Sequence, residues 1–235
     1  MLVRETSYVK KEIQDIVMAD LVLTLAFALT LSGGIYYIHT AGFAHTFIIG
    51  LEISFVAVTL SFVLHELMHK FVAQHFGAVA GFRTSDIGLI ITLFTGAMGF
   101  LFGIPGATMI YASNFTKKEN GIVSLAGPLT NFVVFGVFFA ALIAINPPVT
   151  SFMFSLLFFT VFISLWLAFF NMLPIFPLDG SKVLAWNKLV YVIIMSVIVG
   201  LLFYTGIVPY IVPVSGLAFV LIIAVFFSMF YRNLF

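Results

Sequence analysis

The chain has 235 residues, of which 63% are hydrophobic and only 8% are charged, and its formal charge at pH 7 is +1. So few charges would not cover the surface of a soluble domain, and the mean hydropathy of +1.22 indicates an integral membrane protein embedded in a lipid bilayer. The sequence contains no dense basic patch, so we expect no nucleic-acid partner. Cysteine is absent, which excludes disulfides and thiolate ligands, so a metal ion would need His, Asp or Glu.

The N-terminal segment, residues 1–18, is rich in charged residues. The apolar stretch that follows is too long for the hydrophobic region of a cleavable signal peptide. We therefore expect 1–18 to be a cytoplasmic or interfacial segment, one that could lie on the membrane surface.

Apolar runs, each close to the roughly 20 residues that a membrane helix needs, occupy most of the remaining chain. They lie at 19–38, 47–69, 86–104, 121–146, 151–173, 189–206 and 213–231. Cytoplasmic loops are enriched in Lys and Arg, and all Lys and Arg fall on one side only if the run 86–104 does not cross. Both termini are then cytoplasmic.

The fold class that follows is an all-α membrane protein, a bundle of about six transmembrane helices in a single domain over 1–235. We expect a re-entrant or membrane-associated strand or helix segment near 86–112. The glycines of that segment suit broken backbone at membrane depth. The alternative for the segment is a buried packing helix.

The segment His65-Glu66-Leu67-Met68-His69 lies at the inner end of the second run. Residues four apart share one helix face, so His65 and His69 can bind one zinc ion, with Glu66 beside it as a base for a bound water. The alternative is a pair of hydrogen-bonded packing histidines. Ionisable residues among Val, Leu and Phe are costly in hydrocarbon without partners, which favours the metal site.

A catalytic zinc site takes a third protein ligand, and three carboxylates are candidates. Asp86 begins the ambiguous run, and Glu52 lies about 20 Å along the helix from His65. Asp179 follows the fifth run on the same side of the membrane as His65 and His69, among prolines and a glycine that permit a sharp turn. A plain loop aspartate at the membrane surface is the alternative for Asp179.

Two further motifs follow the first in the chain, Ser124-Leu-Ala-Gly-Pro128-Leu-Thr-Asn131 and Asn171-Met-Leu-Pro-Ile-Phe-Pro-Leu-Asp179-Gly180. In this order, the three motifs resemble the site-2 protease family of intramembrane zinc metalloproteases, over a catalytic core at about 47–188. The form resembled is the prokaryotic or archaeal one without appended PDZ or CBS domains.

The resemblance implies roles for individual residues. His65, His69 and Asp179 would bind one Zn²⁺, Glu66 would be the general base, and Asn171 would stabilise the oxyanion or position the substrate. The implied activity is hydrolysis of peptide bonds within or near transmembrane segments of membrane proteins, as in regulated intramembrane proteolysis, in a prokaryotic cell membrane.

The resemblance also implies a strand or hairpin beside the site, here at 103–111. Its Gly103 and Gly106 would bind substrate, because a free strand edge can take an extended segment by strand addition. This chain departs from the family in the longer apolar stretch before it, about 86–102. We expect Gly127 and Pro128 to allow close helix packing, and Asn131 to hydrogen-bond across helices or to contact the substrate.

The main alternative function is a membrane transporter or channel that uses the His, Glu and Asp cluster as an ion or proton site. The absence of inverted repeats in the sequence weighs against it. A membrane oxygenase is a further alternative, because two histidines and a carboxylate also suit iron. That chemistry does not require a glutamate inside the histidine pair.

Overall fold

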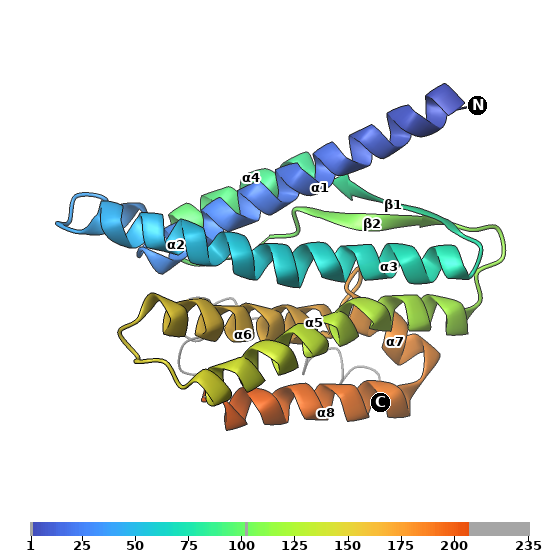
Figure 1. Cartoon of the computed structure of the whole chain (residues 1–235). Coiled ribbons are helices and arrows are strands. Elements are labelled where there is room, and N and C mark those ends of the chain that lie inside the picture. Colours follow the sequence, from blue (N-terminus) through green and yellow to red (C-terminus); the bar gives the residue numbers. More distant parts are fainter. Residues whose placement is uncertain (1, 102, 207–235) are drawn as a thin grey trace, which may run out of the picture.

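The computed structural model describes residues 2–101 and 103–206 (Figure 1). The helices and strands, in chain order, are α1 (Leu2–Leu31), the 3-10 turn η1 (Ile35–Tyr37), α2 (Phe43–Val58), the π-helical turn η2 (Thr59–Val63), α3 (Leu64–His75), β1 (Val79–Thr84), α4 (Asp86–Ala97), β2 (Gly106–Tyr111), α5 (Lys117–Ile145), α6 (Phe152–Asn171), α7 (Asp179–Trp186) and α8 (Lys188–Tyr204).

Among the described residues, four helical stretches are long and apolar enough to cross a membrane; they are Tyr8–Leu31, Phe43–His75, Lys117–Ile145 and Phe152–Asn171. The predicted all-α membrane fold is confirmed. At 12 residues, α4 is only about 18 Å long against a hydrocarbon core of about 30 Å, so it is too short to cross as a helix, in agreement with the charge distribution. The shorter apolar helix α8 coincides with the predicted run 189–206, and the run 213–231 lies outside the described residues.

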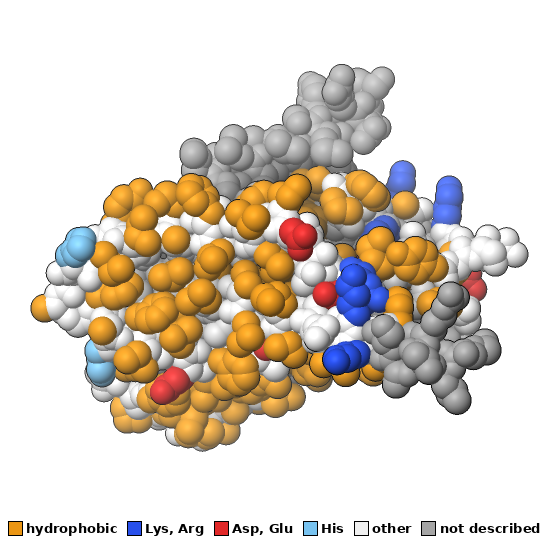
Figure 2. Space-filling view, turned by 90° about the horizontal axis from the view of Figure 1, so that it is seen from above, with side chains coloured by type: hydrophobic (Ala, Val, Ile, Leu, Met, Phe, Trp, Pro, Cys, Tyr) orange, Lys and Arg blue, Asp and Glu red, His pale blue; other side chains and the backbone are white. Residues whose placement is uncertain are grey.

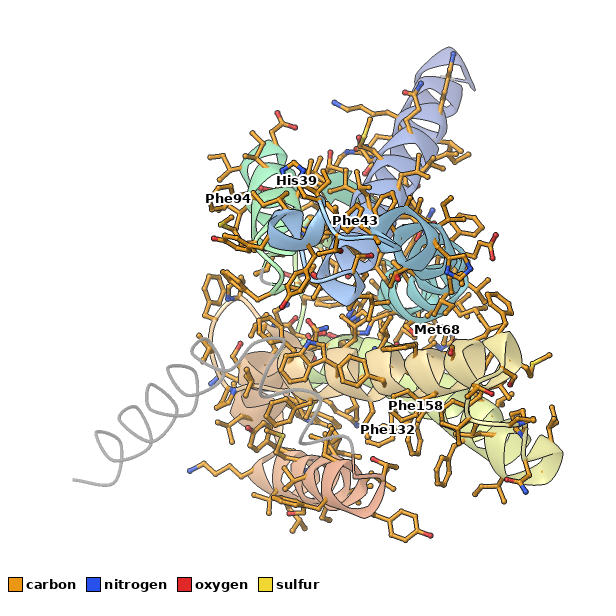
Figure 3. The ribbon with its side chains drawn as sticks, turned by 90° about the vertical axis from the view of Figure 1, so that its left-hand side faces the viewer. His39, Phe43, Met68, Phe94, Phe132 and Phe158 are labelled. Carbon is orange, nitrogen blue, oxygen red and sulfur yellow. The ribbon has the colours of Figure 1, made fainter. Side chains whose placement is uncertain are left out.

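The helices form two layers (Figure 1). The first layer contains α1, the continuous helix from α2 to α3, α4 and the two-stranded sheet, and the second contains α5, α6, α7 and α8. A side view shows His39, Phe43 and Phe94 in the first layer and Phe132 and Phe158 in the second (Figure 3). The layers meet where α3 packs against α5 and α2 against α6, and the hydrophobic core lies between them.

The charged N-terminal segment is the first part of α1, which continues into the first membrane helix without a break. Glu12 is only 3% exposed. Its carboxylate accepts hydrogen bonds from Lys70 Nζ at 2.8 Å and from the backbone N–H of Phe82 at 3.2 Å. Asp15 lies 3.6 Å from Arg83 Nη1. These contacts fasten the start of α1 to α3 and β1.

The two strands are antiparallel, with Phe82 opposite Thr108. The N–H of Phe82 is turned away from β2 toward Glu12, and the N–H of Thr108 is turned away from β1 toward Glu66. In the part of the chain that the structure describes, the outer edge of β2 therefore has no strand partner and is free except at Thr108, whose N–H donates to Glu66. The strand predicted at 103–111 is β2, whereas its partner β1 was not predicted.

Charge is unevenly distributed along the bundle. Figure 2 shows a surface covered largely by hydrophobic side chains, with Lys and Arg gathered toward one end and His at the other. The helix that contains Lys70 ends at this basic end, and α5 and α8 begin there with Lys117 and Lys188 (Figure 1). This segregation is the one expected for a protein whose two ends face different sides of a membrane.

Candidate metal centre

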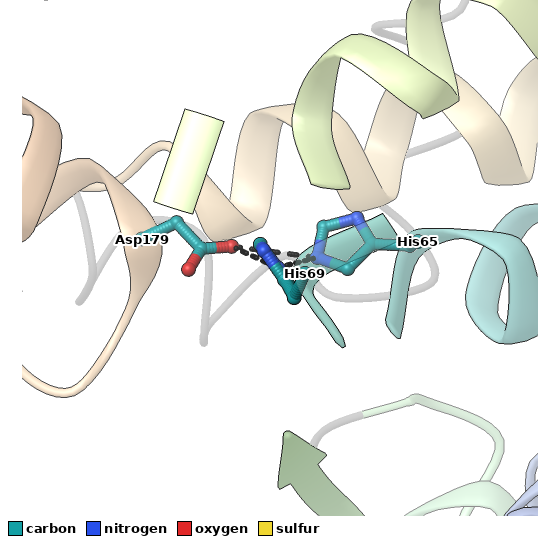
Figure 4. A group of neighbouring side chains, drawn as sticks. All are labelled: His65, His69 and Asp179. Atoms are coloured by element: carbon teal, nitrogen blue, oxygen red, sulfur yellow. Dashed lines mark hydrogen bonds and ion pairs between the residues drawn. The ribbon is translucent and has the colours of Figure 1, made fainter. Parts of the chain in front are cut away.

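Three buried side chains converge from α3 and from the first residue of α7 (Figure 4). The Nε2 atoms of His65 and His69 lie 3.0 Å apart. Asp179 Oδ2 lies 3.4 Å from His65 Nε2 and 3.1 Å from His69 Nε2. The three residues are 2%, 6% and 8% exposed. The structure thus brings together the two histidines and one of the three candidate carboxylates.

This geometry fits a zinc ion. Ligand bonds of about 2.0–2.1 Å in a tetrahedral site place the ligand atoms roughly 3.3–3.4 Å apart, and the three measured separations are 3.0, 3.1 and 3.4 Å. Two imidazoles and a carboxylate are a ligand set of catalytic zinc sites, which keep a fourth position open. Glu52 and Asp86, the other two candidates, are exposed and do not belong to the cluster.

The helix that carries the histidines is interrupted just before them. The π-helical turn η2 ends at Val63, and α3 begins at Leu64. Such turns often occur at functional sites, where they rotate the following helical face. Ser61 Oγ lies 2.7 Å from Ser164 Oγ, which fastens η2 to α6. The i, i+4 spacing within regular α3 then places both imidazoles on one face.

Asp179 reaches the cluster because the chain turns sharply after α6. Within the segment from Met172 to Leu178, both Met172 and Leu173 are buried, and a Cβ on Gly180 would collide with the Met172 carbonyl. Burial raises the pKa of the Asp179 carboxyl, but the neighbouring imidazoles of His69 and His65 lower it more, so the pKa lies below its usual range. The carboxyl is therefore ionised, as a metal ligand must be.

Two groups on α5 contact the far nitrogens of the imidazoles. His69 Nδ1 lies 2.7 Å from the carbonyl oxygen of Val123. A carbonyl only accepts, so His69 Nδ1 carries the proton and Nε2 is left as the metal-binding atom. Asn131 Nδ2 lies 3.2 Å from His65 Nδ1, and Asn131 is fully buried. Asn131, predicted to bind substrate, thus lies behind His65.

Close approach of α5 to the histidines depends on Gly127. A Cβ at this position would lie 2.5 Å from the Nε2 atoms of both His65 and His69. The sequence predicted that Gly127 lets helices approach closely, but it did not predict that the neighbouring side chains would be the two histidines. The signal that could have indicated this contact was a small residue in an apolar helix that packs opposite a metal-binding motif.

Glu66 lines a cleft together with His69, Asn171 and Asp179; we call the hollow that contains these four residues the polar cleft. Glu66 Oε2 accepts two hydrogen bonds from Thr108, one from its N–H at 2.9 Å and one from its hydroxyl at 2.8 Å. The strand β2 therefore holds the carboxylate of Glu66. No feature of the sequence singled out Thr108.

The remaining predicted residues lie around the same cleft. Asn171 ends α6 and lines the polar cleft, and its amide donates to the Leu167 carbonyl at 3.0 Å. Gly106 lines the polar cleft as well. Gly103 lines an adjoining apolar hollow.

Comparison with protein-family models and with solved structures gave no match. Comparison with curated proteins gave three informative relatives. The chain is 42% identical over 153 residues to "Putative zinc metalloprotease MJ0611" of Methanocaldococcus jannaschii, which is 65% of this chain and 79% of that protein. It is 32% identical over 138 residues to "Putative zinc metalloprotease Rip2" of Mycobacterium tuberculosis, 53% of each chain.

A third relative, "Zinc metalloprotease MJ0392" of Methanocaldococcus jannaschii, is 28% identical over 130 residues, 55% of this chain and 32% of that protein. All three names are those of zinc metalloproteases, so the transporter alternative is not favoured. The match to the first relative covers most of that protein. It agrees with the three sequence motifs and with the buried group of His65, His69 and Asp179, which can bind one metal ion. The chain belongs to the site-2 protease family of zinc metalloproteases.

Proposed function

We propose that this metalloprotease is an intramembrane endopeptidase, which hydrolyses peptide bonds within or near the transmembrane segments of other membrane proteins. The observation that carries the proposal is the burial of the cluster of His65, His69 and Asp179 inside the layered bundle, on a helix long and apolar enough to cross a membrane. In this proposal, these three residues are the zinc ligands and Glu66 is the general base.

Zinc in a site of this kind polarises the substrate carbonyl and lowers the pKa of water toward ~7. The residues of the chain supply the proton transfers. Thr108 engages Oε2 of Glu66, which leaves Oε1 as the atom that takes a proton from the attacking water. Glu66 then gives this proton to the amine of the leaving segment.

Two further groups act on the substrate in this proposal. Asn171 lines the polar cleft, and rotation of its side chain away from the Leu167 carbonyl would allow its amide to donate to the developing oxyanion. The free edge of β2, which begins at Gly106, would bind an extended substrate segment through its backbone. A membrane helix has its peptide groups already hydrogen-bonded, so local unwinding of the substrate onto this edge exposes the bond to attack.

The basic end of the bundle gives the proposed orientation. The turn that carries Asp179 into the polar cleft lies near the end of the bundle where Lys70, Lys117 and Lys188 gather. Lys and Arg are enriched on the cytoplasmic side, so we place this end of the bundle, and the start of α1, in the cytoplasm of a prokaryotic cell. Water would reach the cleft from that side.

The test is cleavage of single-span membrane segments by the purified, zinc-loaded protein in detergent or liposomes. In Glu66→Gln, we expect zinc to stay bound and cleavage to fall by roughly 10²- to 10⁴-fold, because the variant lacks only the base. In Asp179→Ala, we expect loss of both zinc and cleavage. Glu52→Gln, an exposed site on the same membrane helix, is the matched control and should retain both. Undiminished cleavage by Glu66→Gln, or after removal of zinc by a chelator, would contradict the proposal.

A further inference from the structure

A second hollow opens beside the polar cleft. We call it the apolar pocket, and it lies between the two layers, with walls from α1, from α2 and η2, and from α6. The apolar pocket and the polar cleft share the residues at their boundary, which are Glu66, Ile104, Gly106, Asn171 and Leu178. A group that occupies the apolar pocket therefore lies next to the base and the amide proposed for catalysis.

The walls of the apolar pocket are hydrophobic. Leu23 and Phe27 come from α1, Val58 and Phe62 from α2 and η2, and Trp166 and Phe170 from α6. Among the described residues that line it, the only charged or amide side chains are Glu66 and Asn171, both at the boundary with the polar cleft. A charged or polar substrate group would lose its hydration there without partners, so the pocket suits an apolar group.

The size of the apolar pocket limits which apolar group it can take. Its volume is about 90 Å³. An apolar cavity that admits benzene measures about 150 Å³, so this hollow suits a side chain smaller than an aromatic ring. A single aliphatic side chain, such as that of Leu, Ile, Val or Met, is the group that fits.

The free edge of β2 explains how such a side chain arrives. Successive side chains of an extended segment point to opposite faces. A substrate that pairs with the outer edge of β2 at Gly106, which lines the hollows together with Glu66, can therefore turn one side chain into the apolar pocket while its neighbours face the other way.

We propose that the apolar pocket is the specificity pocket of the enzyme, and that it receives the aliphatic side chain of one residue directly beside the scissile bond. This inference rests on the proposed intramembrane peptidase function. It adds a substrate preference that depends on α1, a helix that carries none of the proposed catalytic or metal-binding residues.

The first experiment measures the preference. A single-span segment that the wild-type protein cleaves is analysed by mass spectrometry to locate the scissile bond, and the residue on each side is changed in turn to Ala, Leu or Phe. We expect kcat/KM at one of these two positions to be roughly 10- to 200-fold higher for Leu than for Ala. Phe should be a poor substrate at that position.

The second experiment changes the pocket. Leu23→Phe should fill the apolar pocket and reduce the ratio of kcat/KM for Leu over Ala by at least about 10-fold. Phe27→Ala should enlarge the pocket and raise kcat/KM for Phe relative to Leu. Leu21→Phe makes the same substitution on α1 as Leu23→Phe at a side chain that is 52% exposed, and it should leave both ratios at their wild-type values.

The outcomes separate the inference from the function on which it rests. Equal cleavage of the Ala, Leu and Phe substrates by the wild-type protein, or the same ratios in both pocket variants as in wild type, would overturn the specificity pocket and leave the peptidase intact. Absence of cleavage of every segment tested would overturn the proposed function as well. Bound zinc is measured in each variant, and if Leu23→Phe fails to fold, the ratio in Phe27→Ala decides.

Discussion

Asn131 presents the nitrogen of its amide to His65, with Nδ2 3.2 Å from Nδ1, while its Oδ1 is buried and has no hydrogen-bond partner within residues 2–101 and 103–206. If Nδ2 donates to Nδ1, the proton of a neutral His65 sits on Nε2, the atom that faces Asp179. A metal ion at Nε2 requires the opposite tautomer, with Nδ1–H donating to an acceptor. Rotation of the amide by half a turn exchanges oxygen and nitrogen with little change of shape, so Oδ1 is the atom that we expect to face His65 when zinc is bound.

This expectation is tested by replacing Asn131 with a side chain that accepts a hydrogen bond, or with one that neither donates nor accepts. Asn131→Asp retains an acceptor and should keep zinc affinity within a few-fold of wild type, whereas Asn131→Leu should weaken it by about 10- to 100-fold. Zinc affinity is measured by competition with a chelator, and the absorption spectrum of the cobalt-substituted protein reports the ligand geometry. Equal zinc affinity in wild type and Asn131→Leu, or equally weak binding in both variants, would contradict the expectation that an acceptor opposite His65 Nδ1 supports zinc binding.

A methyl group at Gly127 should interfere directly with the metal centre. Its carbon would lie 2.5 Å from both Nε2 atoms, so Gly127→Ala should push α5 from α3 and abolish stoichiometric zinc binding. Gly136→Ala makes the same change on the same helix, where no atom of the described residues lies within 4 Å of the added carbon, and it should leave zinc content unchanged. Zinc is measured by elemental analysis of the purified variants, and full occupancy in Gly127→Ala would contradict the close approach of α5.

Thr108 should affect the rate and leave the metal in place. Thr108→Val removes the hydroxyl that donates to Glu66 Oε2 at 2.8 Å but keeps the backbone N–H. A hydrogen bond contributes about 0.5–1.5 kcal/mol, so kcat should fall roughly 2- to 10-fold at unchanged zinc content. In Thr46→Val, at the far end of α2, the hydroxyl lost is exposed and donates to the Gly42 carbonyl, and kcat should not change. A rise in KM at unchanged kcat would instead assign Thr108 to substrate binding.

Glu12 should matter for stability and not for zinc. Its carboxylate is 3% exposed and joins Lys70 on α3 to Phe82 on β1. Removal of one partner of a buried pair costs about 3–5 kcal/mol, and we expect Glu12→Ala to fall at the lower end because the Lys70 side chain is 20% exposed and can be rehydrated. The exposed neighbour Lys11 provides the control, Lys11→Ala. Equilibrium unfolding in detergent measures both, and equal midpoints would contradict a structural role for the buried pair.

Much of the fold follows from local sequence. The apolar runs predicted the long helices because a membrane helix must satisfy its backbone within one continuous segment, and the distribution of Lys and Arg predicted that 86–104 does not cross. The strand β1 and the short helix α7 were not predicted. β1 is held by its pairing with β2 and by Glu12, which are contacts between distant segments that no periodicity within Val79–Thr84 can indicate.

The sequence by itself determined the pair of histidines, because the i, i+4 spacing that joins His65 to His69 is set by one turn of a helix. The three motifs also predicted the family, which the relatives confirm. Only the tertiary structure decided that Asp179, rather than Glu52 or Asp86, completes the cluster, and that Asn131 and Gly127 lie against the histidines. The physical reason is that α3 belongs to one layer and α5 and α7 to the other, and that all three come from distant parts of the chain. Their separation is fixed by interlayer packing, which depends on all the side chains between them.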